Sequence, residues 1–304
     1  MNIRIATRKS ALALWQANHV ADALKQLPHV TNVELVPLTT RGDETLDRSL
    51  QKIGGKGLFI KELEIAIEAG DADIAVHSMK DVPINIPKNF CIAAVLKRAN
   101  PADALIGKNL NNLAEGASVG SSSPRRQVQL IALRPDIRVQ SLRGNINTRL
   151  KKLADGQYDA IMLACAGLER LGLASQISET FSLNQMLPAA AQGVIGIECL
   201  EHRPELLQVL QLLNHPGTKT VTMAERAVTK QLQADCQSPV AAFCEIDGST
   251  LNLRAMVASP DGRKIIRTQI SGPTNEPEKL GMSLANKLFD LGAAKLLSQP
   301  GAEE

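Results

Sequence analysis

Short apolar runs alternate with amphipathic stretches along the first third of the chain. Ile3–Ala6, Val33–Leu38 and Ile74–Val76 have the length and composition of buried strands. Between them, apolar positions recur at helical spacing and predict helices over Ala11–Leu27 and Phe59–Ala69. This β-α-β alternation is typical of a doubly wound α/β sheet.

The same alternation resumes after Asn100-Pro101. Ser118–Gly120, Ile137–Ser141 and Tyr158–Ala164 predict strands with helical patterns between the first two and after Ser141. A further strand at Val194–Glu198 is expected to return to the first sheet, which would make the second unit an insertion in the first.

The pattern changes beyond residue 214. The turn-forming residues of Asn214–Gly217 predict a linker, and a helix is expected over residues 220–233. Three strands joined by turn residues predict an antiparallel meander: Val240–Ile246, Leu251–Ser259 and Lys264–Ser271. A helix over residues 277–297 should cover one face. The chain therefore predicts three domains: residues 1–98 with 194–214, residues 99–193, and residues 215–304.

Composition narrows the class of protein. A chain of 304 residues with 44% hydrophobic and 21% charged residues is typical of a globular protein with several cores. The net charge of +3 and the aromatic content of 2% argue against a nucleic-acid binder. No apolar run approaches membrane-spanning length, and Met1–Ala6 enters a strand pattern without a signal peptide. We expect a cytoplasmic protein that binds neither nucleic acid nor membrane.

The five cysteines are odd in number, widely spaced and free of any Cys-x-x-Cys pair. This spacing argues against a disulfide framework and against a zinc cluster. Cys91, Cys165 and Cys199 have apolar neighbours and are expected in the core. Cys236 stands among polar residues, where a loop would leave its thiol accessible.

Polar side chains follow the strand at Ile74–Val76, namely His77, Lys80 and Asp81. Ligands of open α/β sheets bind just beyond the carboxyl ends of strands, so these groups are candidates for proton and charge handling. The alternative is an ordinary strand exit with solvated charges, and this stretch alone leaves both interpretations open.

Arginines also follow predicted strand ends. Arg8 lies between a strand and the helix that Ser10 is expected to cap, a favoured place to hold an anion. Ser123 and Pro124 form a strong helix-start signal, and Arg125 and Arg126 then occupy a first turn where the helix dipole disfavours cations. Such arginines make sense if they meet a bound anion.

The surrounding stretch, residues 117–152, holds eight basic side chains and one acid. A solvated basic face is the alternative to an anion-binding surface. Three glycines surround Lys56 in Gly54–Phe59, but the loop lacks the spacing of a Walker phosphate loop.

These motifs, taken together and in order, resemble the porphobilinogen deaminase (hydroxymethylbilane synthase) family over essentially the whole chain. The matching stretches are Arg4–Ser10, Gly54–Phe59, Ala75–Pro83, Arg125–Gln127, Ser141–Asn145, Gly167–Leu173, Ala190–Gly193 and the Cys236 loop. The resemblance implies two doubly wound lobes like type II periplasmic-binding-protein domains with a cleft between them, plus a small C-terminal α+β domain with an antiparallel three-stranded sheet.

The resemblance also implies a transferase that acts as a monomer without metal. A dipyrromethane cofactor would be joined to Cys236 by a thioether, and four porphobilinogen molecules would be added to it with loss of ammonia before hydroxymethylbilane is released. Asp81 would stabilise the positive charge that develops beside the pyrrole nitrogen. Lys56 and Phe59 would belong to a lid loop. The remaining matched positions would bind the carboxylates of cofactor and substrate: Arg8, Ser10, Lys80, Ser123, Arg125, Arg126, Arg143, Arg149, Arg170 and Gln192.

Four positions depart from the family pattern. Two glycines usually precede the attachment cysteine, and Ala234-Asp235 stand there instead. Pro124 replaces a usual leucine and Ser238 a common valine. The main rival interpretation is a non-enzymatic two-lobed protein that binds small anions.

Overall fold

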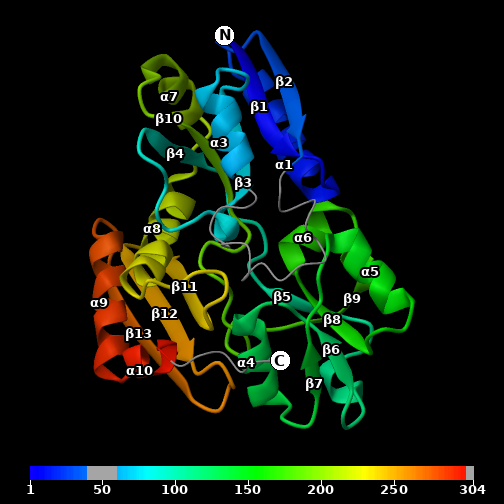
Figure 1. The fold of residues 1–304 in the computed structure, drawn as a ribbon. Helices are drawn as coiled ribbons and strands as arrows, with labels where there is room; N and C mark the ends of the chain where they lie inside the picture. Colours follow the sequence, from blue (N-terminus) through cyan, green and yellow to red (C-terminus); the bar gives the residue numbers. More distant parts are fainter. Residues whose placement is uncertain (40–59, 299–304) are drawn as a thin grey trace. The chain divides into compact units, whose positions relative to one another are not determined.

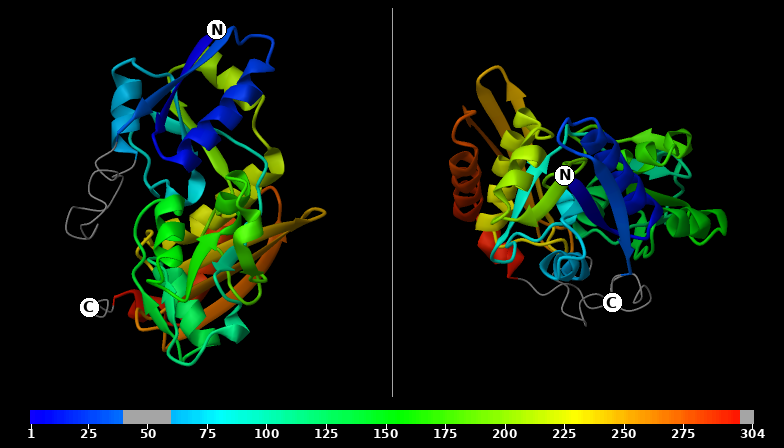
Figure 2. Two further views of the ribbon diagram at one scale, coloured as in Figure 1. Left: turned by 90° about the vertical axis from the view of Figure 1, so that its right-hand side faces the viewer. Right: turned by 90° about the horizontal axis from the view of Figure 1, so that it is seen from above.

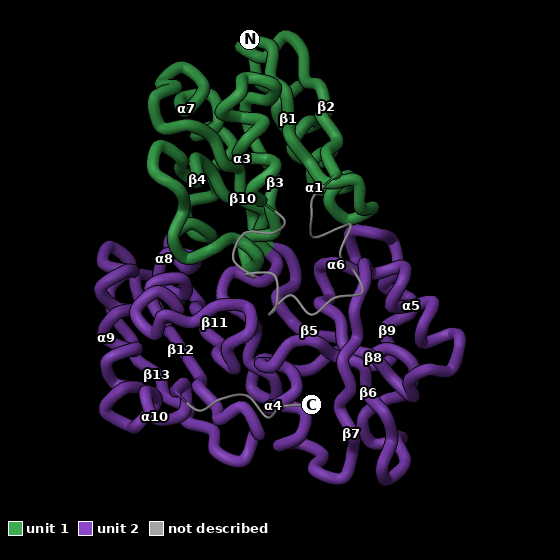
Figure 3. Tube along the Cα trace, viewed as in Figure 1, with its two compact units in different colours: residues 1–98, 194–219 green, residues 99–193, 220–304 purple. Residues whose placement is uncertain are grey.

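The computed structural model describes residues 1–39 and 60–298, and the chain divides into two compact units. Unit 1 comprises Met1–Arg98 and Val194–Lys219, and unit 2 comprises Ala99–Gly193 and Thr220–Glu304 (Figure 3). The chain thus leaves unit 1 after Arg98 and returns to it at Val194. The lid residues Lys56 and Phe59 lie outside the described residues.

Unit 1 is built on a five-stranded sheet in the order β2-β1-β3-β10-β4. Its strands are β1 (Asn2–Arg8), β2 (Asn32–Leu38), β3 (Ile74–Ser78), β4 (Phe90–Val95) and β10 (Ile195–Leu200). The first three are parallel, whereas β10 runs antiparallel to both β3 and β4. The strand predicted to return to the first sheet is therefore confirmed.

Helices cover both faces of this sheet (Figures 1 and 2). They do so because the strands carry apolar side chains on both faces, and both faces must be buried. Helices α1 (Ala11–Lys25) and α7 (Pro204–Gln211) pack on one face, and α3 (Lys61–Glu68) packs on the other. Ser10 caps α1 as expected, with its Oγ accepting a hydrogen bond from the Ala13 amide at 3.4 Å.

Unit 2 repeats this topology in a second five-stranded sheet, ordered β7-β6-β8-β5-β9. Its strands are β5 (Asp103–Ile106), β6 (Ser118–Gly120), β7 (Arg138–Gln140), β8 (Ala160–Ala164) and β9 (Ile177–Thr180). Strands β6, β7 and β8 are parallel, and β5 is antiparallel to its neighbours, as β10 is in unit 1. Three helices flank the sheet: α4 (Pro124–Leu133), α5 (Ile146–Ala154) and α6 (Cys165–Arg170).

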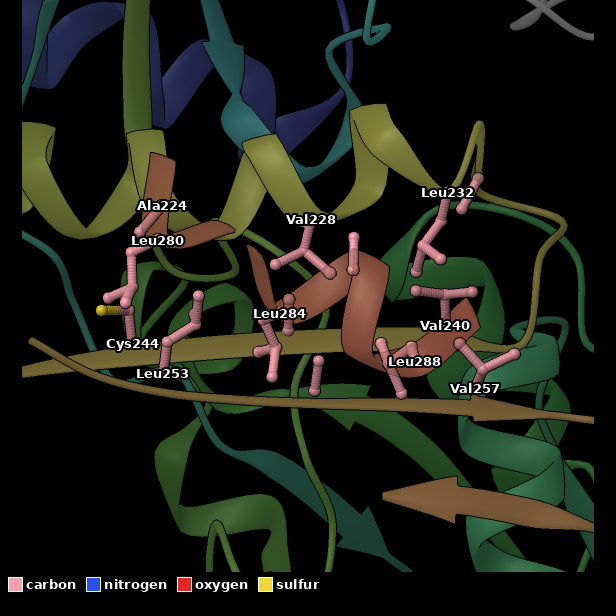
Figure 4. Packing of buried hydrophobic residues seen from close by; sticks show 14 of the residues in the cluster. Ala224, Val228, Leu232, Val240, Cys244, Leu253, Val257, Leu280, Leu284 and Leu288 are labelled. Carbon is pink, nitrogen blue, oxygen red and sulfur yellow. The ribbon is translucent and has the colours of Figure 1, made fainter. Parts of the chain in front are cut away.

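The C-terminal part of unit 2 is an antiparallel sheet of β11 (Val240–Asp247), β12 (Thr250–Ala258) and β13 (Ile265–Pro273). One face packs against α8 (Pro216–Gln231), α9 (Pro277–Asp290) and α10 (Ala293–Leu297). Figure 4 shows Val228 of α8 and Leu284 and Leu288 of α9 meeting the sheet. Each fully buried leucine stabilises this core by about 1.5–3 kcal/mol. The expected fold class, two α/β lobes and a small α+β part, is confirmed.

Two expectations about the C-terminal third are wrong. Residues 214–217 are not a linker, because Pro216 begins α8, and proline fits the first turn of a helix, where its missing N–H costs nothing. The last helix is also interrupted at Gly292, whose φ of 98° is a left-handed conformation that glycine adopts without strain.

The opposite face of the C-terminal sheet packs against the second lobe. Phe243 and Met256 share an apolar cluster with Val128 of α4 and with Leu187. This contact groups the lobe and the C-terminal part in one compact unit. The division of the chain into three domains stays a prediction.

Candidate functional site

The polar group after β3 lies on a short turn that the rest of unit 1 holds in place. Met79–Asp81 form a single 3-10 turn, with Asp81 exposed and Lys80 half-buried. The Ser78 hydroxyl accepts a hydrogen bond from Gln16 Nε2 at 2.8 Å, and the Met79 amide donates to the carbonyl of Val194 at 2.9 Å. The fold thus presents the Asp81 carboxylate to solvent on an anchored backbone.

Met79 secures this turn through a close fit with a glycine. Its side chain is 2% exposed and lies over Gly196 of β10. A Cβ atom at position 196 would overlap the Met79 sulfur and approach its Cγ to 2.9 Å. Because Cγ is not the far end of the side chain, Met79 would have to leave its rotamer inside a packed core. The sequence pattern contained no sign of this pairing.

His77 is engaged within unit 1. Its Nε2 lies 2.8 Å from a carboxylate oxygen of Glu198, and the two side chains are 5% and 1% exposed. Glu64 on α3 belongs to the same group, since burial and the negative charge of Glu198 raise its pKa to about 7. The pair of His77 and Glu198 therefore links β3 to β10 behind the turn.

Arg8 and Ser10 lie at the same sheet edge as Asp81. Strands β1 and β3 are parallel neighbours, so the residues that follow them emerge side by side. Arg8 ends β1 and is half-buried, and Ser10 begins the helix that follows. Unit 1 thus brings Arg8, Lys80 and the Asp81 carboxylate to one edge, where anion binding and charge stabilisation are both feasible.

In unit 2, Arg125 and Arg126 meet an anion that the sequence interpretation missed. The carboxylate of Asp103, on β5, is fully buried and lies 2.6 Å from Arg125 Nη1 and 2.7 Å from Arg126 Nη2. Burial by itself raises the pKa of the Asp103 carboxyl, but the charges of the two arginines outweigh it and hold that pKa well below its usual range. An acid at the start of an apolar strand was the available signal, because a buried acid needs a cation.

The guanidinium groups of Arg125 and Arg126 also donate hydrogen bonds to backbone carbonyls inside unit 2. Arg125 donates to the carbonyl of Leu187 at 2.8 Å, and Arg126 donates to that of Met162 at 3.1 Å. Two positive charges against one negative leave a surplus of one. The pair can therefore attract a further anion, although Asp103 already accounts for its position.

Gln192 belongs to the Asp103 network, and Arg170 binds the backbone of the next residue, Gly193. Gln192 Nε2 donates to Asp103 Oδ1 at 2.9 Å and to the carbonyl of Pro101 at 2.7 Å. Arg170 Nη2 donates to the carbonyl of Gly193 at 2.7 Å, and burial lowers the pKa of Arg170 to about 10. Both residues hold the segment that leaves unit 2 at Gly193.

The other predicted basic residues follow the parallel strands of unit 2. Ser123 follows β6 and precedes α4, and Arg143 follows β7 in a half-buried position. Arg149, on α5, donates from Nε to the carbonyl of Gly144 at 2.7 Å. Because the carboxyl ends of parallel strands share one edge, Ser123 and Arg143 emerge along the same edge of this sheet. Helix α6, which ends at Arg170, begins directly after β8 at that edge.

Cys236 is exposed, in a loop between α8 and β11. The loop is a compact turn in which the Ser238 hydroxyl donates to Asp235 Oδ1 and accepts from the Asp235 amide, each at 3.0 Å. The Gln237 amide donates to the same carboxylate oxygen. Neither Ala234 nor Asp235 has positive φ, and the left-handed residue is Gln233, at 53°. The turn therefore tolerates the missing glycines.

The described residues contain no cluster of three or more His, Cys, Asp or Glu side chains able to hold a metal ion. Nor does that part of the chain include a helix with the length and apolar character needed to cross a bilayer.

Fold and site together define a class: an α/β protein of two similar lobes that carries an exposed thiol, a strand-end carboxylate and arginines at strand ends. Residues 3–208 match the family model of the porphobilinogen deaminase dipyromethane cofactor binding domain, and residues 219–290 match that of the porphobilinogen deaminase C-terminal domain. The chain belongs to the porphobilinogen deaminase family.

Relatives match over nearly the full length. A porphobilinogen deaminase of Xanthomonas axonopodis pv. citri is 50% identical, covering 98% of this chain and 99% of its own. A porphobilinogen deaminase of Chromobacterium violaceum is 49% identical, and the match covers 99% of this chain and 98% of that protein. Among solved structures, the periplasmic VFT2 domain of Bordetella pertussis BvgS is 13% identical with a TM-score of 0.41, covering 69% of this chain and 85% of its own, a likeness too low to carry an inference.

Replacing Gly196 by Ala should lower kcat roughly 10- to 100-fold, because the displaced Met79 moves the backbone of Asp81. Steady-state kinetics with porphobilinogen and thermal unfolding measure the effect. The double variant Met79→Ala/Gly196→Ala removes the overlapping atoms and should recover part of the lost turnover. Unchanged turnover in Gly196→Ala would show that the fit does not position the turn.

Asp103→Asn should destabilise the protein by about 3–5 kcal/mol at pH 7, because it leaves two buried arginines without a counter-charge. The folded pKa of Asp103 is depressed, so its contribution is present above the unfolded value of about 3.9 and is lost as pH falls toward the folded pKa. Denaturant unfolding should show the two proteins converging in acid.

Asp155→Asn is the matched control, since Asp155 pairs with Lys151 on the surface, where an ion pair contributes about 0–1 kcal/mol. Equal losses in the two variants would contradict the special role of Asp103.

Proposed function

We propose that the protein is a hydroxymethylbilane synthase, which condenses four porphobilinogen molecules head to tail with loss of ammonia and releases hydroxymethylbilane by hydrolysis. We rest this proposal on one observation, the 50% identity to a named porphobilinogen deaminase across 98% of the chain. The anchored Asp81, the arginines at strand ends and the exposed Cys236 agree with it.

Asp81 would act on charge and protons. Loss of ammonia leaves an electron-poor azafulvene whose positive charge is shared with the pyrrole N–H. A carboxylate on an immobile turn stabilises that charge as it develops, without having to reorganise. The same carboxylate can accept the proton that the pyrrole ring releases when it regains aromaticity.

The cations would bind the acetate and propionate groups of each unit. Arg8, Ser10 and Lys80 supply donors at the edge of the unit 1 sheet, and Ser123, Arg143 and Arg170 supply them at the edge of the unit 2 sheet. Arginine suits this task because its planar group can bind a carboxylate with two hydrogen bonds. Arg125, Arg126 and Gln192, which are also proposed to bind these groups, belong to the Asp103 network. Arg149, the last proposed binding residue, lies on α5.

Arg125, Arg126 and Gln192 would act partly through the Asp103 network. Their hydrogen bonds fix the first turn of α4 and the segment before Gly193. The surplus positive charge of the network would favour polycarboxylate binding nearby.

The residues around Cys236 fit the attachment of the dipyrromethane named by the family model. The thiol is exposed, and the Asp235 carboxylate beside it is held by Ser238 and by the Gln237 amide. When bound, the dipyrromethane supplies the pyrrole carbon onto which porphobilinogen is added. Cys236 would hold it through a thioether that stays intact during turnover.

We further propose that the enzyme is a cytoplasmic monomer without metal, and that Lys56 and Phe59, outside the described residues, form part of a lid. A lid that excludes water would protect the growing chain from early release.

Asp81→Ala should fold normally and lose activity about 10²- to 10⁴-fold, because it removes both the stabilising charge and the proton acceptor. Product formation and circular dichroism measure the two effects. Glu68→Gln, which removes an exposed acid of α3, is the matched control and should retain activity. Near-normal product formation by Asp81→Ala would remove Asp81 from this role.

Cys236→Ser should lack the covalent cofactor. After incubation with porphobilinogen, the intact mass of the wild-type protein should exceed that of the bare chain by two condensed porphobilinogen units, and that excess should be absent from the variant. Cys91→Ser is the control and should keep the added mass. An unmodified, inactive wild-type protein would instead support a two-lobed protein that binds small anions.

A further inference from the structure

Two cysteines of unit 1 stand directly opposite each other on neighbouring strands. Cys91 of β4 and Cys199 of β10 are partners in the register of an antiparallel pair. Directly opposite residues point their side chains to the same face of a sheet, so both thiols lie on the face covered by α7. Both cysteines are free.

The geometry of such a pair suits a disulfide. Residues opposite each other in an antiparallel pair have Cα atoms about 4.5–5.5 Å apart, and disulfides span about 4.4–6.8 Å. The interaction between the two thiols lowers the pKa of Cys91 and raises the pKa of Cys199. The pair therefore divides into a more acidic thiol and one that stays protonated.

The more acidic thiol is also the one that solvent can reach. Cys91 is half-buried, whereas Cys199 is 0% exposed. An oxidant from solvent would reach Cys91 first and find the second thiol already beside it. The other buried cysteines differ, because Cys165 contacts the Thr180 hydroxyl and Cys244 stands opposite Leu253.

We propose that Cys91 and Cys199 form an oxidative modification site that closes to a disulfide when a hydroperoxide reaches it. The Cys91 thiol gives up its proton, its sulfur attacks one peroxide oxygen, and the O–O bond breaks. The hydroxide that leaves takes up that proton, so a sulfenic acid and water form. The Cys199 sulfur then attacks the Cys91 sulfur, its proton goes to the leaving hydroxide, and a second water departs. Two thiols and one hydrogen peroxide thus give one disulfide and two waters.

This bond would join β10 and β4, which are neighbours at one end of the unit 1 sheet. Strand β4 leads to the point where the chain leaves unit 1, and β10 follows the point where it returns. Between Cys91 and Cys199 lies the entire first segment of unit 2, so the bond would close a large loop without changing which strands pair.

The test treats the cofactor-loaded protein with an excess of hydrogen peroxide, alkylates remaining thiols after unfolding, and maps peptides without reduction. We expect a linked pair of the peptides that contain Cys91 and Cys199, lighter than their sum by two hydrogen atoms and separated by dithiothreitol. Cys91→Ser, a change at a half-buried position, should abolish the link and leave Cys199 open to alkylation.

Three results would overturn the proposal. One is full alkylation of both cysteines after oxidation. Another is sulfinic acid at Cys91 with no link, and the third is a disulfide that joins either residue to a different cysteine. Since the wild-type protein itself is mapped, the outcome does not depend on whether a variant folds.

Discussion

Three charged side chains meet in the interior of unit 2, and much of the candidate site depends on them. Asp103 is fully buried, and only the two guanidinium groups of Arg125 and Arg126 make its charge tolerable there. In turn it holds those arginines in the first turn of α4, where the helix dipole alone would disfavour them. Through Gln192 the same carboxylate also fixes the segment that leads back to unit 1. The buried ion-pair cluster thus includes two of the arginines proposed to bind carboxylates.

The described residues of unit 1 hold a candidate carboxylate in place without a buried arginine. Its exposed carboxylate, Asp81, lies on a turn held by a side chain in contact with a glycine and by hydrogen bonds from neighbouring segments. Behind the turn, His77 and Glu198 form a buried pair. Rigid support of an exposed charge is what electrostatic catalysis needs, because a mobile group would have to reorganise as the charge develops.

The two five-stranded sheets share one strand order, and each takes its single antiparallel strand, β10 or β5, from a crossing between the units. This arrangement places strand ends, and the arginines that follow them, at corresponding edges of both lobes. The departures near Cys236 are accommodated locally, since the compact turn uses Asp235 and Ser238 in place of glycine flexibility. The basic stretch of residues 117–152 is partly neutralised within the chain, because four of its eight cations pair with acids.

The sequence by itself determined the fold class, most elements within a few residues, the return of β10, the capping of α1 by Ser10 and the family. These follow from local periodicity, from caps and from motifs in order, which are properties of short stretches. Only the tertiary structure decided that Asp103 is the partner of Arg125 and Arg126, that Gly196 seats Met79, and that Cys91 faces Cys199. Each of these pairs joins residues far apart in the chain, and register and side-chain packing bring them together. No local pattern records such a contact, which is why the arginines alone suggested a bound anion where the fold supplies its own.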